Sequence, residues 1–340
     1  MDTPRIIQSS PLTQEQQIEN SLRPQILDDF IGQEKLKENL KIFIAAAKVR
    51  KEALDHCLFY APPGLGKTTL SHIIAKEMGT NLVITAGPAL SQKADLATIL
   101  TNLHEGDIFF IDEIHRMPHV IEEYIYPAME DFKLDVIIGQ GGPAAKIVKL
   151  PLPHFTLIGA TTRAGLLSSP LRDRFGIVQH LDFYDLDSLI KILHRSSSIM
   201  NIEVMADAAC EIAARSRGTP RIVNRLLRRV RDFAQIEGGI ITKKIAQKAL
   251  QALEVDNAGL DKMDRILLTT LINKFGGGPC GVETLAIAIS EDVDTITDVY
   301  EPYLIQSGFI ARTPRGRVVT EAGFKHLGIT PKSSKQKSLF

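Results

Sequence analysis

The segment 60–70, YAPPGLGKTTL, constrains the fold of this 340-residue chain more than any other feature. A short apolar run, 57–60, precedes it, and residues with helical spacing follow it over 69–76. A strand, a glycine-containing loop and a helix in this order predict a phosphate-binding loop. The alternative interpretation, an ordinary Gly/Pro turn before a helix, accounts for the glycines but not for the adjoining Gly-Lys-Thr.

Each residue type in this loop suits contact with a nucleotide. The two glycines let the backbone amides turn toward phosphate oxygens, Lys67 supplies a positive charge, and Thr68 offers its hydroxyl to Mg²⁺. Ala61 departs from the usual pattern, which has glycine there, and its methyl group would strain the loop if that position required a positive φ. The nucleotide-binding residues predicted here are Gly64, Gly66, Lys67, Thr68 and Thr69.

Composition narrows the class of protein without assigning a function. Lys plus Arg and Asp plus Glu each number 40, so the formal net charge is zero and contact with nucleic acid requires local basic patches. Three cysteines lie far apart, without the CxxC spacing of a zinc site or a disulfide framework. The chain has no apolar run of 18 residues and no signal-peptide pattern at its start. We therefore expect a cytoplasmic protein without a membrane segment.

Strands and helices alternate through the first half of the chain, which predicts a parallel sheet covered by helices. The run 107–111 ends in Asp112 and Glu113, and carboxylates at the end of a buried strand lie where α/β sheets bind ligands. Asp112 would reach Mg²⁺ through water, and Glu113 would polarise the water that attacks the γ-phosphate. The alternative is an acidic pair that opens a helix.

Three further segments of this half bear on function. Alternating apolar residues on both sides of 139–143 predict a β-hairpin over 133–149. A strand over 157–163 ends in threonines, where Thr162 could sense the γ-phosphate. The loop 169–176 carries Arg172 and Arg174, which in isolation would indicate only a solvated loop.

From about residue 184 the strand pattern stops, and 184–255 reads as helices only. Thr219 and Pro220 have the types of a helix cap and first helical residue, and Arg221 follows. An arginine at this helix start is well placed to reach a nucleotide held by the preceding domain. The remaining arginines of this helix could instead form a solvent-exposed face or a row of basic side chains that binds nucleic acid.

The segment 256–330 predicts a winged helix. Two short helices separated by 291–294 have helix-turn-helix spacing, and two short strands bracket a turn at 313–316. Three arginines on this ribbon, Arg312, Arg315 and Arg317, favour DNA binding over the alternative, a protein-binding winged helix. Residues 1–20 and 331–340 are polar and lack periodicity, so we expect a flexible arm and a disordered tail.

These motifs together resemble the RuvB family of AAA+ motors, over roughly residues 20 to 330. The resemblance rests on PPGLGKTT (62–69), FIDEIHR (110–116), GATTR (159–163), SPLRDRFG (169–176), GTPR (218–221) and RTPRGR (312–317). It implies an α/β P-loop AAA+ domain over 21–183, a small helical lid over 184–255 and a winged-helix DNA-binding domain over 256–330. It also implies an ATPase that drives branch migration of Holliday junctions in recombination and repair.

The resemblance further implies partners and residue roles. The partners are ATP or ADP with Mg²⁺, five further copies in a hexameric ring around duplex DNA, RuvA bound to the hairpin 133–149, and RuvC. Thr162 would be sensor 1, Arg174 an arginine finger offered to a neighbouring subunit, and Arg221 sensor 2. The remaining residues of the nucleotide pocket would be Leu22, Arg23, Glu130, Asp131, Phe132 and Tyr184.

Two rival classes share the same ATPase core. One is a clamp loader or remodeller that acts on proteins, which the C-terminal winged helix and DNA-stimulated hydrolysis would distinguish. The other is a subunit that binds nucleotide without hydrolysing it. Ala61 makes this class worth considering, because the usual phosphate-binding loop has glycine at that position. The presence of Lys67, Asp112, Glu113 and Arg174 argues against the second class.

Overall fold

The structure, a computed structural model, describes residues 21–138 and 146–330, and the predicted arm 1–20, tail 331–340 and hairpin tip lie outside this range. The chain divides into two compact units. Residues up to 61, 66–182 and 194–202 form the first, and residues 62–65, 183–193 and 203 onward form the second. In the described part of the chain, no helix is long and apolar enough to cross a membrane.

A five-stranded parallel sheet lies at the centre of the first unit, in the order β2-β3-β6-β1-β7. Apolar side chains of β3 and β6 are fully buried, as expected for a parallel sheet covered on both faces. The strands are β1 (Cys57–Tyr60), β2 (Leu82–Ala86), β3 (Ile108–Asp112), β6 (Thr156–Thr161) and β7 (Ile177–His180).

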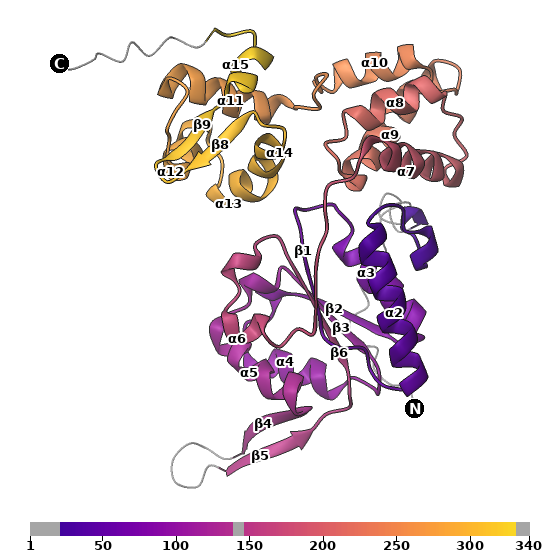
Figure 1. Cartoon of the computed structure of the whole chain (residues 1–340), viewed down its shortest axis with the longest axis vertical. Coiled ribbons are helices and arrows are strands. Elements are labelled where there is room, and N and C mark those ends of the chain that lie inside the picture. Colours follow the sequence, from indigo (N-terminus) through magenta and orange to yellow (C-terminus); the bar gives the residue numbers. More distant parts are fainter. Residues whose placement is uncertain (1–20, 139–145, 331–340) are drawn as a thin grey trace, which may run out of the picture. The chain divides into compact units, whose positions relative to one another are not determined.

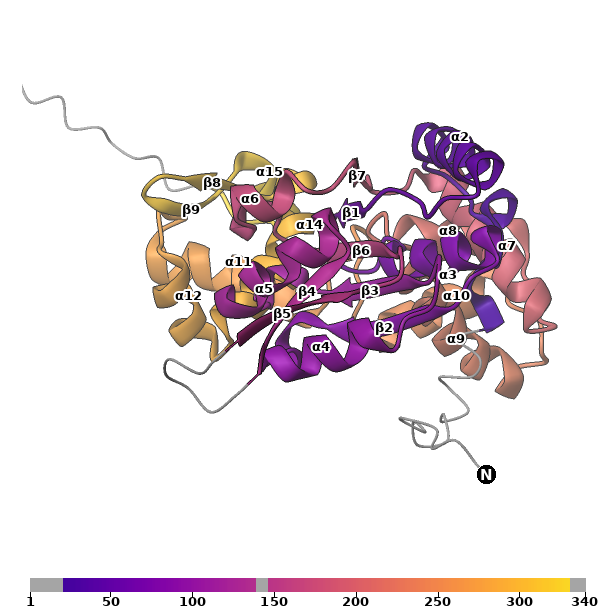
Figure 2. The same ribbon diagram turned by 90° about the horizontal axis from the view of Figure 1, so that it is seen from below.

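Helices cover the two faces of this sheet, with α2 and α3 on one face and α4 and α5 on the other (Figures 1 and 2). Phe109 and Ile111 of β3 belong to a core cluster with Leu96 of α4 and Ile125 of α5. The helices are α2 (Glu34–Arg50), α3 (Lys67–Met78), α4 (Lys93–Thr101), α5 (His119–Glu130) and α6 (Ser169–Arg172), with short 3-10 turns η1 (Leu27–Asp29), η2 (Gly87–Ala89), η3 (Ile114–Arg116) and η4 (Ala164–Leu166).

The predicted hairpin is present as β4 (Lys133–Ile138) and β5 (Lys146–Pro151), paired antiparallel, and it extends away from the sheet (Figure 1). Leu134 at its base is fully buried in the core cluster. Farther along β5, Val148 and Leu150 expose 43% and 38% of their surface. The hairpin therefore presents apolar side chains that its own unit does not cover.

The second unit begins with helices and ends with a winged helix. The first part contains α7 (Leu186–Ile199), whose residues from 194 onward are grouped with the first unit, and α8 (Ala206–Ala214), α9 (Pro220–Ile236) and α10 (Lys243–Ala252). The second contains α11 (Lys262–Phe275), α12 (Val282–Ile289), α13 (Val293–Thr295), the π-helical turn η5 (Ile296–Tyr300), α14 (Glu301–Gln306), the ribbon β8 (Ile310–Thr313) and β9 (Gly316–Val319), and α15 (Glu321–His326). The helix-turn-helix and ribbon predicted from the sequence are both present.

Two details differ from the sequence-based expectations. β7 was not predicted, and it lies at the edge of the sheet, paired only with β1 among the named strands. Thr219 precedes α9, but its hydroxyl donates to the Arg217 carbonyl at 3.0 Å and does not cap the helix, although Pro220 takes the first helical position.

Candidate nucleotide and DNA sites

The predicted phosphate loop and both catalytic segments meet at one edge of the sheet. β1, β6 and β3 are parallel, and β6 pairs with both β1 and β3. The loop follows Tyr60 of β1, Thr162 follows β6, and Asp112 ends β3. Because neighbouring strands are about 4.8 Å apart, these three chain segments lie within about 10 Å of one another in the direction across the strands. This is the carboxyl edge of a parallel sheet, where α/β proteins bind ligands.

The phosphate loop has the backbone that the glycines predict. Gly64 and Gly66 have φ of 84° and 107°, in the region that favours glycine. Ala61 is not in that region, so its methyl group causes no backbone strain. Lys67 is the first residue of α3, its side chain is buried, and its Nζ donates to the Ala61 carbonyl at 2.7 Å.

Glu113 is held at the edge of the sheet by Thr162. The Thr162 hydroxyl donates to Glu113 Oε2 at 3.2 Å, and the Thr162 amide points to the same oxygen at 3.4 Å. The structure therefore brings together the predicted water-activating carboxylate and the predicted γ-phosphate sensor. His115 Nδ1 lies 3.3 Å from the same Oε2. No role was predicted for His115 from the sequence, although it lies two residues beyond the carboxylate.

Thr68 and Asp112 could hold Mg²⁺. Both lie at the carboxyl edge of the sheet, and the Asp112 Oδ1 accepts a hydrogen bond from the Glu113 amide at 3.0 Å. Among the described residues, no group of three or more His, Cys, Asp or Glu side chains forms a candidate metal centre. Mg²⁺ commonly takes one or two protein oxygens and completes its shell with phosphates and water, which a hydroxyl and one carboxylate fit.

Leu22 and Arg23, predicted to border the adenine, lie near the helix that follows the phosphate loop. The Leu22 carbonyl accepts a hydrogen bond from Arg195 at 2.7 Å, and the Leu22 side chain is buried. Burial and then the charge of Arg23 lower the pKa of His72, which is on α3. These contacts agree with a place beside the nucleotide, and the adenine contact itself stays a prediction.

Within the second unit, Tyr184 and Arg221 contact the residues 62–65 that belong to it. The Tyr184 hydroxyl donates to the Leu65 carbonyl at 3.3 Å, and the Arg221 amide to the Gly64 carbonyl at 3.4 Å. A Cβ atom at Gly64 would lie 2.8 Å from Thr219 Cγ2, so only glycine fits there. Both predicted residues therefore touch the phosphate loop, and the side chain of Arg221 is exposed.

Arg174 lies at the opposite edge of the sheet from its own phosphate loop. It is three residues before Ile177, which begins β7 beside Cys57, the first residue of β1. The phosphate loop follows the far end of β1, about 10 Å away at about 3.3 Å per residue. Arg174 is held by Glu130 at 2.8 Å and by the Pro170 carbonyl at 2.6 Å. Its role as an arginine finger for a neighbouring subunit stays a prediction.

Glu130, Asp131 and Phe132, predicted to line a nucleotide pocket, lie at the same end of the sheet as Arg174, and their contact with a nucleotide stays a prediction. His56 immediately precedes β1, and its Nε2 donates to the Met129 carbonyl at 3.0 Å while its Nδ1 accepts from the Leu157 amide at 2.9 Å. Burial lowers the pKa of His56, which agrees with this neutral form. The segment after Met129 therefore lies at the amino end of β1. Phe132 packs on His154 and Phe155 at the base of the hairpin.

The wing presents two of its three predicted DNA contacts to solvent. Arg312 and Arg315 are exposed. Arg317 is buried, and its guanidinium forms an ion pair with Glu301 of α14, with Nη2 3.1 Å from Oε2. The prediction that Arg317 grips a phosphate is therefore corrected, since this side chain joins the ribbon to a helix. A local count of arginines could not distinguish a paired side chain from an exposed one.

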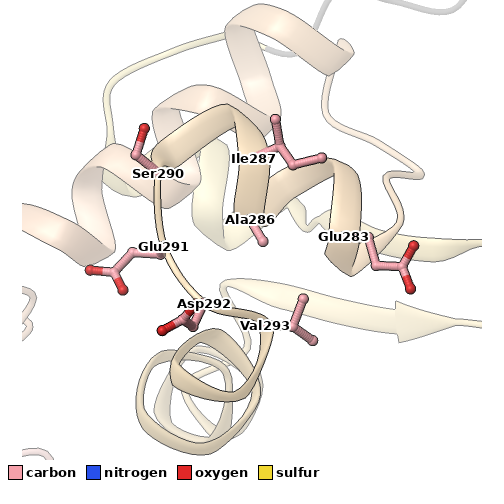
Figure 3. A pocket seen from close by; sticks show the side chains of 7 residues that line it. All are labelled: Glu283, Ala286, Ile287, Ser290, Glu291, Asp292 and Val293. Carbon is pink, nitrogen blue, oxygen red and sulfur yellow. The ribbon is translucent and has the colours of Figure 1, made fainter.

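The helix-turn-helix carries a pocket of about 500 Å³ whose rim is acidic (Figure 3). Glu283 of α12 lies on one side of the pocket, and Glu291 and Asp292 of the turn lie on the other. Exposed Ile287 contributes an apolar side chain. Carboxylates repel DNA phosphates, so this face is a poor DNA contact and the wing is the better one.

The fold and site define a P-loop AAA+ ATPase followed by a helical lid and a winged helix. Three family models match the chain in turn: the Holliday junction DNA helicase RuvB P-loop domain over residues 22–181, the RuvB AAA lid domain over 184–256, and the RuvB C-terminal winged helix domain over 257–328. The chain belongs to the RuvB family.

Solved structures agree with this assignment. The Thermotoga maritima RuvB Holliday junction branch migration motor is 50% identical, with a TM-score of 0.85 and coverage of 91% of this chain and 99% of that one. Two single-residue mutants of Thermotoga maritima RuvB are also 50% identical, cover 91% of this chain and 98% of their own, and have TM-scores of 0.85 and 0.84.

Proposed function

We propose that this ATPase assembles into a hexameric ring and uses ATP hydrolysis to move duplex DNA at Holliday junctions. The observation that carries the proposal is the placement of Glu113 and Arg174 at opposite edges of one sheet. With this placement, rapid ATP hydrolysis requires that Arg174 of a neighbouring subunit reach the site. A ring of identical subunits provides this arrangement.

In the proposed reaction, Lys67 and the loop amides bind the β- and γ-phosphates, and Glu113 accepts the proton of the attacking water. Mg²⁺ bound by Thr68 and, through water, by Asp112 would neutralise phosphate charge. Thr162 would donate its hydroxyl to the γ-phosphate, and Arg221 would follow the nucleotide state from the lid. Arg174 of a neighbour, with Glu130 beside it, would complete the site and stabilise the charge that develops in the transition state.

Contacts outside the ATP site complete the proposal. The hairpin β4–β5 would dock RuvA, since exposed Val148 and Leu150 offer the apolar surface that a protein partner covers. Arg312 and Arg315 would contact DNA phosphates. RuvC would join at the same junction. We retain the cytoplasm as the location, because the three cysteines of the chain are free thiols that fit a reducing compartment.

The matches to RuvB models over all three domains favour this function over a clamp loader or protein remodeller. ATP hydrolysis measured with and without duplex DNA tests the proposal directly. We expect DNA to accelerate hydrolysis by the wild type. Glu113→Gln should bind ATP but not hydrolyse it, because an amide keeps the shape and cannot accept the proton. Lys67→Ala should lose binding as well. Turnover in Glu113→Gln equal to that of the wild type would contradict the proposed role of this carboxylate.

A further inference from the structure

His115 is a nearly buried side chain in contact with the ATP-hydrolysis site. Only 5% of its side chain is exposed, and its Nδ1 lies 2.9 Å from Thr161 Oγ1 and 3.3 Å from Glu113 Oε2. Thr161 Oγ1 also accepts a hydrogen bond from the Arg163 amide at 2.9 Å. A carboxylate offers only lone pairs, so both contacts of Nδ1 are attractive only when this nitrogen carries a hydrogen. The contact with Glu113 therefore requires the tautomer that carries a hydrogen on Nδ1, and in that tautomer Nδ1–H faces both oxygens.

The backbone brings the two side chains together. Glu113 has a φ of 47°, in the left-handed region, and its carbonyl accepts the Arg116 amide at 2.9 Å. Gly87 packs against this turn so closely that a Cβ there would lie 2.5 Å from the Glu113 carbonyl oxygen. A side chain at position 87 would therefore displace this turn. With the backbone held in this way, the position of the carboxylate depends on the contacts of its side chain.

Those contacts fall on one oxygen. Oε2 of Glu113 receives the hydroxyl and amide of Thr162 as well as Nδ1–H of His115, whereas Oε1 faces none of these three donors. The single hydroxyl hydrogen of Thr162 cannot serve Oε2 and a γ-phosphate at the same time. When Thr162 turns to the phosphate, the contact between His115 and Oε2 remains.

We propose that His115 is a positioning residue for ATP hydrolysis. Its Nδ1–H holds Oε2 of Glu113 so that Oε1 is directed at the attacking water throughout the step in which Thr162 contacts the phosphate. The inference rests on the proposed roles of Glu113 and Thr162, and it assigns to His115 no contact with the nucleotide.

Three substitutions of His115 test the inference. His115→Ala removes one hydrogen bond to a charged group, which should lower kcat by about ten- to a hundredfold. The Kd for ATP should stay within about twofold, because the proposal gives His115 no contact with the nucleotide. His115→Asn places an amide NH near the position of Nδ1 and should recover most of the loss. His115→Gln carries its amide one carbon farther and should not. Equal activity of the Asn and Gln variants, or a loss in ATP affinity as large as the loss in kcat, would overturn the proposal.

A double-mutant cycle separates this inference from the proposed function. If His115 acts through Glu113, adding His115→Ala to Glu113→Gln should leave the residual turnover unchanged. A further tenfold fall in the double variant, with Glu113→Gln itself slow, would overturn the role of His115 alone. Full turnover in Glu113→Gln would instead overturn the assignment of the base, and the inference with it.

Discussion

Replacing Arg317 by methionine removes a guanidinium from a buried ion pair and keeps a side chain of similar length. Arg317 and Glu301 are 6% and 2% exposed, and two nitrogens of the arginine contact the carboxylate. The variant leaves the Glu301 carboxylate buried without its partner, which costs about 3 to 5 kcal/mol. We therefore expect the winged helix of Arg317→Met to be destabilised, although Arg317 makes no contact with DNA in this account.

Hydrogen exchange of the full chain measures this loss in the domain concerned. For amides of α14 and β9 that exchange through opening of the domain, a loss of 3 to 5 kcal/mol corresponds to a fall in protection of about 150- to 5,000-fold. The matched control is Arg312→Met on the adjacent strand, because Arg312 is exposed and should leave protection nearly unchanged. The double variant Glu301→Met with Arg317→Met should recover most of the protection, since both charges are then absent. Protection in Arg317→Met equal to that of the Arg312→Met control would show that the ion pair does not stabilise the winged helix.

Three further predictions concern the ring, the wing and the thiols. Arg174→Ala should bind ATP but hydrolyse it about 10³ to 10⁵ times more slowly than the wild type. Mixing this variant with Lys67→Ala subunits should restore some hydrolysis, because each variant keeps the residue that the other lacks. Mixed rings without activity would argue against a role of Arg174 in the neighbouring site. Arg312→Ala should lower the slope of log affinity for duplex DNA against log salt by roughly one and leave basal ATP hydrolysis unchanged, and an unaltered slope would show that the wing does not hold a phosphate there. Burial raises the pKa of the Cys57 thiol, so N-ethylmaleimide at pH 8 should label exposed Cys210 and spare Cys57 until the chain is denatured. Peptide mass spectrometry measures the labelling of each cysteine. Rapid labelling of Cys57 in the native protein would contradict its burial.

Much of the ATP site could be predicted from the sequence because strand direction determines where its residues meet. Buried apolar runs end at Asp112 and just before Thr162, and in a parallel sheet such ends share one edge with the loop after β1. The contact between Thr162 and Glu113 follows from that arrangement. His115 could not be found in this way, because its role depends on a left-handed turn at Glu113 that the residue types do not indicate.

The remaining differences have physical causes of other kinds. β7 is a four-residue edge strand whose Val178 is largely exposed, so it lacks the apolar run that predicts a buried strand. Arg317 pairs with Glu301, sixteen positions away, and a charged residue on a ribbon looks the same in sequence whether it is paired or free. The place of Glu130 beside Arg174 could not be predicted either, because α5 carries the chain from the carboxyl edge of the sheet back to the amino edge, and a list of motifs does not show this reversal.

The proposed function requires that this chain convert ATP hydrolysis into movement of DNA at a four-way junction. The most direct test is the separation of a synthetic four-way junction into two duplexes, followed on a native gel with RuvA, ATP and Mg²⁺ present. We predict that the wild type separates the junction only with ATP, and that Glu113→Gln leaves it intact while still binding both ATP and the junction. A wild-type protein that hydrolyses ATP faster with DNA yet leaves the junction intact would contradict the claim.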